Sequence, residues 1–202
     1  MSRFVHILAA VAALVSGALV ACGEDKTAKV LSGYQLTPPP SVGSLALPDA
    51  SANGVDFAFA AATGSLLIVY FGYTQCPDVC PTTLNEVKLA LKHLDANASK
   101  VELAMISIDP VRDSGNLLTN YVESFVPGSH ALRTDDETLL RSVAKRFGAA
   151  YSITSDAQGN EKVSHSGNLY VVDQAGTVVL EWPFGLKADA IATDLEILFG
   201  KA

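Results

Sequence analysis

The most constraining feature of the sequence is an apolar run that leads into two cysteines. The run Leu66–Phe71 has no polar alternation, which is typical of a strand buried on both faces. The chain then reads Cys76-Pro-Asp-Val-Cys80, and an amphipathic stretch begins at Pro81. A strand that ends in a dithiol and continues into a helix indicates a thioredoxin-like fold.

The rest of the chain alternates between strand and helix patterns. Thr134 and Glu137 are spaced as in a capping box, and Gly148 is a helix stop signal, so they bound one predicted helix. This order predicts an α/β fold, in which a thioredoxin-like sheet has helices on both faces. Besides Leu66–Phe71, strands are predicted at Val101–Ile108, Asn168–Val172 and Val178–Trp182, and helices at Pro81–Leu94, Asn116–Phe125, Thr134–Phe147 and Ala188–Phe199.

Length and charge narrow the class of protein. The chain has 202 residues, which suits one domain with appendages, and its 49% hydrophobic content supports a sizeable core. Its net charge is -7. Nucleic-acid binding needs a basic surface, so no nucleic-acid partner is expected.

The first 21 residues resemble a lipoprotein signal peptide. Arg3 precedes the uncharged apolar run Phe4–Val20, and the sequence Leu-Val-Ala before Cys22 is similar to a bacterial lipobox. Lipidated Cys22 would then anchor the chain to a membrane of the bacterial cell envelope, facing the periplasm. The alternative is an uncleaved membrane helix, which would tether the domain similarly. Residues 22–41, with three consecutive prolines, are predicted to be a membrane-tethered linker, and residues 42–202 a thioredoxin-like domain.

Three roles are open for the thiols that remain, Cys76 and Cys80. A structural disulfide would close too short a loop to constrain the unfolded chain strongly. A redox pair and a pair of metal ligands both fit the spacing, because residues four apart lie on one face of a helix. A helix N-terminus at this position is expected to lower the pKa of the thiols.

A histidine would distinguish these roles, because two thiolates with one imidazole suit copper. His6 would leave with the signal peptide, His93 lies near the end of a helix, and His130 is expected in a loop. His165 precedes the strand predicted at Asn168–Val172, and in a thioredoxin-like sheet that loop lies beside the dithiol. The alternative for His165 is a solvated loop residue.

These residues resemble the Sco/SenC family. Phe71–Leu84 (FGYTQCPDVCPTTL) closely matches its copper motif, and Ser107–Asp113 (SIDPVRD) is similar to its second signature. The histidine before an apolar strand and an Asp-x-x-Gly turn matches as well. The resemblance covers residues 42–202.

The resemblance implies a copper-binding, membrane-anchored protein with Cys76, Cys80 and His165 as ligands of Cu(I) or Cu(II). It implies delivery of copper, or reduction of thiols, during assembly of the binuclear copper centre of cytochrome c oxidase. The implied partners are the copper-centre subunit and another copper chaperone or thiol oxidoreductase. Two residues depart from the family pattern. Ser164 stands where Asp is usual, which weakens a possible hydrogen bond that orients the imidazole, and Gln75 also differs.

Two enzymatic alternatives use the same thiols. In a thiol–disulfide oxidoreductase without a metal role, Cys76 attacks and Cys80 resolves. A peroxide reductase would need a donor such as Arg112 or Arg133 beside the thiolate. The carboxylates around Arg112 are expected to hold a turn by Arg–carboxylate pairing.

Overall fold

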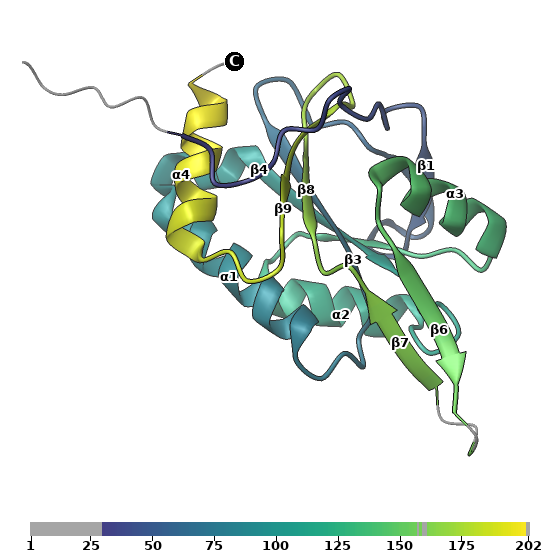
Figure 1. Ribbon diagram of the computed structural model, residues 1–202. Helices are drawn as coiled ribbons and strands as arrows, with labels where there is room; N and C mark the ends of the chain where they lie inside the picture. Colours follow the sequence, from purple (N-terminus) through teal and green to yellow (C-terminus); the bar gives the residue numbers. More distant parts are fainter. Residues whose placement is uncertain (1–29, 157, 159–160, 201–202) are drawn as a thin grey trace, which may run out of the picture.

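The computed structural model describes residues 30–156, 158 and 161–200. A seven-stranded sheet with the order β2-β1-β5-β4-β3-β8-β9 forms its centre (Figure 1). The strands are β1 (Ala46–Asp49), β2 (Val55–Ala58), β3 (Leu66–Gly72), β4 (Val101–Ser107), β5 (His130–Leu132), β8 (Leu169–Val172) and β9 (Val178–Trp182).

Strand β3 lies in the interior of this sheet, between β4 and β8, and leads to the dithiol. It runs parallel to β4 and antiparallel to β8, and each of its residues is buried. A strand covered on both faces needs no polar alternation, which explains the continuous apolar run.

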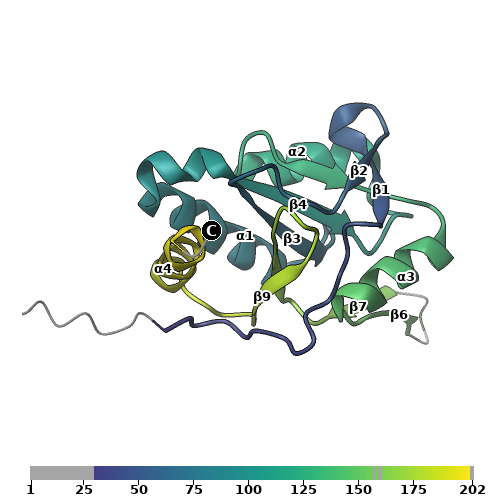
Figure 2. The same cartoon turned by 90° about the horizontal axis from the view of Figure 1, so that it is seen from above.

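Helices cover both faces of the sheet. Helix α1 (Val79–His93) packs against α4 (Ala188–Phe199) and contacts α2 (Gly115–Phe125) on one face, whereas α3 (Glu137–Phe147) lies on the other (Figure 2). Phe147 of α3 packs edge-on against Phe71 of β3 and Tyr170 of β8, with ring centroids 5.5 Å from each. The predicted α/β sheet with helices on both faces is confirmed. The described residues also form two short 3-10 helices, η1 (Ala50–Ala52) and η2 (Asp95–Lys100).

The N-cap of helix α3 differs from the predicted one. The observed N-cap is Asp136, whose carboxylate accepts hydrogen bonds from the backbone N–H groups of Thr138 and Leu139. Thr134 lies two residues before this N-cap, and its hydroxyl accepts from the Asp136 N–H. The N-cap was therefore predicted two residues too early, and the predicted capping box with Glu137 was wrong, whereas the predicted stop at Gly148 is confirmed by its left-handed φ of 77°.

Residues 30–41, which the sequence assigned to the linker, lie along the edge strand β9. Tyr34 exchanges backbone hydrogen bonds with Glu181, and the carbonyl of Pro40 accepts from Val178. The buried carboxylate of Asp194 in α4 accepts from the Ser32 and Gly33 N–H groups and from the Trp182 indole. This part of the chain is thus held on the domain and protects a sheet edge, whereas the division at residue 42 stays a prediction.

A separate hairpin extends from the body beside α3. Strands β6 (Tyr151–Ser155) and β7 (Glu161–His165) pair with each other in a two-stranded sheet of their own. The sequence reasoning missed this hairpin together with the strands β2, β1 and β5, which form one end of the central sheet. The available signal was that Tyr151 and Ile153, and likewise Val163 and His165, are two residues apart with a polar residue between them, as in a strand with one buried face.

The predicted signal peptide and Cys22 fall outside the described residues. Within residues 30–200, the described helices are too short or too polar to cross a bilayer. The lipid anchor therefore stays a prediction.

Candidate metal centre

The two cysteines come together through a turn between β3 and α1. Cys76 precedes the helix, and its backbone N–H donates to the carbonyl of Tyr73 at 3.3 Å. Cys80 is the second residue of α1, and its N–H donates to the Cys76 Sγ at 3.2 Å. Both thiols are free, with 8% of Cys76 and 0% of Cys80 exposed. The expectation that both lie on one helical face was wrong, because the helix starts only at Val79.

Gly72, the last residue of β3, makes room for the second thiol. A Cβ at this position would lie 3.0 Å from the Cys80 Sγ and 2.7 Å from the Tyr70 ring. It would also lie 3.0 Å from the Cε of Met105. Any larger residue at position 72 would therefore displace the Cys80 thiol or the strand beneath it.

His165 meets this dithiol from the end of β7. Its Nε2 lies 3.6 Å from the Cys80 Sγ, and the ligand atoms of Cys76, Cys80 and His165 all lie within 4.8 Å of one another. The structure therefore brings together the three residues that the sequence selected. The other two described histidines lie elsewhere, His93 beside Asp189 and His130 beside Asp49. His130 is in β5 and not in the predicted loop.

Aromatic packing surrounds the imidazole. The rings of Tyr70 and Tyr73 contact His165 edge-on, with centroids 6.1 and 6.0 Å away. The Nδ1 of His165 is buried and has no hydrogen-bond partner among the described residues. The Ser164 side chain is exposed on the opposite face of the strand, so no bond from it orients the ring.

Burial controls the protonation of this site. It lowers the pKa of His165 below its usual 6.5, so the imidazole is neutral at pH 7 and has a lone pair for a metal. Burial also raises the pKa of the Cys80 thiol to about 12, although Tyr70 and Tyr73 oppose the rise. The predicted lowering by the helix N-terminus was thus wrong for Cys80. A metal ion must displace its proton.

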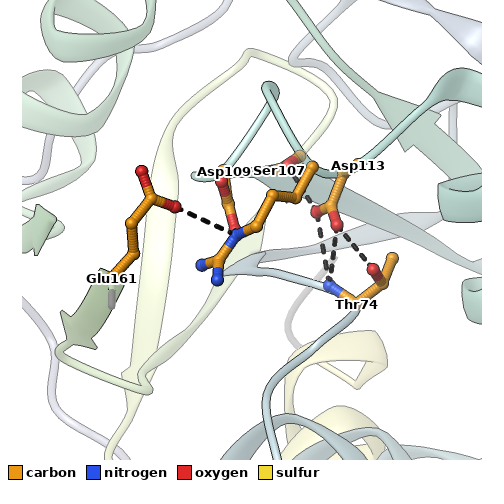
Figure 3. A network of polar contacts seen from close by, with 6 residues as sticks. Thr74, Ser107, Asp109, Asp113 and Glu161 are labelled. Atoms are coloured by element: carbon orange, nitrogen blue, oxygen red, sulfur yellow. Dashed lines mark hydrogen bonds and ion pairs between the residues drawn. The ribbon is translucent and has the colours of Figure 1, made fainter. Parts of the chain in front are cut away.

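The turn after β4 supports the dithiol loop from the side (Figure 3). The buried carboxylate of Asp113 accepts from the Thr74 hydroxyl at 2.5 Å and from the Ser107 hydroxyl at 2.6 Å. The Thr74 N–H also donates to it, at 3.2 Å. Arg112 pairs with Asp109, so the predicted Arg–carboxylate turn is confirmed.

The same turn weakens the peroxide-reductase alternative. The Arg112 Nε lies between the carboxylates of Asp109 and Glu161, and Arg133 binds Asp135 and two backbone carbonyls of the turn. Arg133 is therefore committed to structural partners, which weakens its part of the alternative, whereas Arg112 keeps a buried Nη2 without a hydrogen-bond partner among the described residues.

The comparisons with known proteins identify the family. The SCO1/SenC family model matches residues 48–200. The chain belongs to the SCO1/SenC family. A SCO2-like protein of Rickettsia prowazekii is 31% identical over 141 residues, which are 69% of this chain and 68% of that protein.

Two solved Sco structures have the same fold. Apo Sco1 of Thermus thermophilus superposes with a TM-score of 0.71 at 29% identity, covering 85% of this chain and 99% of that one. ScoI of Bradyrhizobium japonicum, solved with copper bound, gives a TM-score of 0.63 at 28% identity and covers 79% and 96% of the two chains. The predicted family and thioredoxin-like fold are therefore confirmed.

Proposed function

We propose that this protein binds one copper ion through Cys76, Cys80 and His165. The convergence of their three ligand atoms within 4.8 Å carries the proposal. Two thiolates and an imidazole form a soft donor set that suits copper. Membership of a family that includes a copper-bound ScoI structure supports the same ion.

We further propose that the copper is cargo, delivered during assembly of the binuclear copper centre of cytochrome c oxidase. Membership of the SCO1/SenC family supports this role. Three protein ligands leave the ion open to attack by a partner's thiolates, so it can be transferred by stepwise ligand exchange. Lipidation of Cys22 would keep the domain beside its membrane-bound partner on the periplasmic side.

The ligand set is tested by anaerobic Cu(I) titration of the reduced chain from Gly23 onward. This form retains residues 30–41, which pack on β9. We expect one copper per wild-type chain in competition with a Cu(I) chelator, and clearly weaker binding by Cys76→Ser, Cys80→Ser and His165→Ala. Wild-type affinity in His165→Ala would refute the three-ligand site.

A second candidate function, thiol–disulfide exchange, has its own observation. Cys76 is the more exposed thiol, and its Sγ accepts the Cys80 N–H, so it is the sulfur placed to attack first while Cys80 lies beside it to resolve. In this function the Cys76 thiolate attacks a partner disulfide and releases one partner thiolate. Cys80 then attacks the mixed disulfide and releases the second. The partner gains two electrons, and this chain becomes the disulfide.

The two functions separate in an assay with a model disulfide peptide. Exchange that proceeds equally well with a copper chelator present, and stops in Cys76→Ser, would support the oxidoreductase. A reduced chain that binds copper tightly but leaves the disulfide intact would exclude this second function.

A further inference from the structure

Among the described residues, the hairpin that carries His165 makes polar contacts with the body at its base and at the start of β7. Near its base, the Arg141 Nη1 donates to the Tyr151 carbonyl at 3.2 Å, and the guanidinium lies 4.1 Å from the Tyr151 ring centroid. Tyr151 is the register partner of His165. Contact at this end fixes the position of the hairpin's base, but it does not fix the direction in which the strands extend from the body.

The second attachment lies at the other end of β7. Glu161 approaches the Arg112 Nε to 3.3 Å, and Arg112 also pairs with the buried Asp109 (Figure 3). Glu161 and His165 are four residues apart on one strand, so their side chains project from the same face. An attachment at each end defines the direction in which that face points.

Arg112 is also connected to His165 by the aromatic ring of Tyr73, which contacts both residues. Its guanidinium carbon lies 5.9 Å from the ring centroid of Tyr73, which itself packs edge-on against His165. The same turn binds the dithiol loop, because Asp113 accepts two hydrogen bonds from Thr74. One short turn is thus connected to both halves of the proposed metal site.

These contacts matter because the Nδ1 of His165 has no hydrogen-bond partner among the described residues that would aim the ring at the dithiol. Histidines that bind metals usually donate their second nitrogen to a carboxylate or carbonyl. Here the Nδ1 is buried without a partner among the described side chains and backbone groups. The position of the imidazole therefore depends on the hairpin and on the packing of Tyr73.

We propose that Arg112 is a positioning residue that aims His165 at the dithiol through Glu161 and Tyr73. This inference rests on the proposed copper site. Arg112 itself contacts no ligand atom in the proposal. It substitutes for the hydrogen bond that the Nδ1 of His165 lacks.

The test is a double-mutant cycle in the reduced chain from Gly23 onward, with Cu(I) affinity measured by chelator competition. We expect Arg112→Ala to weaken Cu(I) binding roughly tenfold, as for removal of other groups that orient metal ligands. In the His165→Ala background the same substitution should change affinity less than about twofold, because the group it positions is gone. Equal effects in both backgrounds would overturn the proposal.

A milder variant protects the test against misfolding. Glu161→Gln leaves the Arg112–Asp109 pair intact and should weaken binding about threefold, as expected for a partly exposed ion pair. Glu123→Gln, at an exposed site in α2, changes the net charge equally and should bind like wild type. Equal affinities for these two glutamine variants would count against the hairpin attachment.

A spectroscopic readout distinguishes positioning from general loosening. In wild type, Cu(I) should shift the imidazole 15N resonance of His165, and the shift should shrink in Arg112→Ala. Arg112→Lys, which keeps the charge but lacks the planar fork, should lie between them. An unchanged wild-type shift in Arg112→Ala refutes the positioning role. Wild-type affinity in His165→Ala would instead remove the copper site on which the role depends.

Discussion

Gly72 offers the sharpest test of how the fold shapes the dithiol. In Gly72→Ala the new Cβ would approach Tyr70, Cys80 and Met105 to 2.7, 3.0 and 3.0 Å. Nearly all real Cβ contacts are longer than these distances, so the buried neighbours must shift. Overpacking a dense core costs about 1–3 kcal/mol. Reduced freedom of the unfolded chain offsets about 0.4–1 kcal/mol of this cost. The expected net loss is about 1–2 kcal/mol.

Urea unfolding monitored by circular dichroism measures that loss as a lower midpoint at constant slope. Gly200→Ala is a matched control, because position 200 has helix-like backbone angles and its nearest Cβ contact would be 3.5 Å away. The control should remain within about 0.5 kcal/mol of wild type. Cu(I) affinity should also fall in Gly72→Ala, since its Cβ displaces the Cys80 Sγ. Wild-type stability together with wild-type copper affinity would refute the steric argument.

Three further predictions concern the domain around the site. Burial by itself would raise the pKa of Asp49, but hydrogen bonds from Ser51 and His130 outweigh it and lower the pKa below 3.8. The stability that ionised Asp49 contributes is complete above pH 3.8 and is lost as the pH falls through the pKa of the folded state. Asp49→Asn should therefore lower the free energy of unfolding by about 1–3 kcal/mol at pH 7. In the variant, the free energy of unfolding measured in urea should fall less steeply with decreasing pH below pH 3.8. Asp194→Ala should release residues 30–41 to limited proteolysis, where a wild-type digestion pattern would contradict the anchoring role. With free copper at a hundred times its dissociation constant, the folded protein should be about 2.7 kcal/mol more stable than after a chelator has removed the copper. A melting temperature that does not depend on copper would contradict binding to the folded state.

The dithiol shows where local sequence reasoning succeeds and where it fails. The continuous apolar run correctly predicted the buried strand β3, because a strand inside a sheet has no solvated face. The spacing correctly placed Cys80 at a helix start, where the dipole favours a thiolate. It could not show that the same residue has 0% exposure, and the desolvation of Cys80 outweighs the dipole.

The hairpin β6–β7 was harder to predict. Its strands are short, and most of their residues are exposed, so their apolar alternation is weak. His165 was selected because it precedes β8, which is antiparallel to β3 and so brings its loop beside the dithiol. The family pattern strengthened that choice, but the position of the imidazole depends on Tyr73 and Arg112, which are distant in sequence.

The sequence by itself determined the strands β3, β4, β8 and β9, the four α-helices, the family and the three candidate ligands, because periodicity and motif spacing are local properties of the chain. The tertiary structure decided how those ligands meet. It placed Cys76 in a turn before the helix, buried the Cys80 thiol beside Gly72, and left the His165 Nδ1 without a hydrogen-bond partner in the described part of the chain. It also packed residues 30–41 against β9. Burial and long-range contacts appear only when distant segments pack together, and these set the protonation and the geometry of the site.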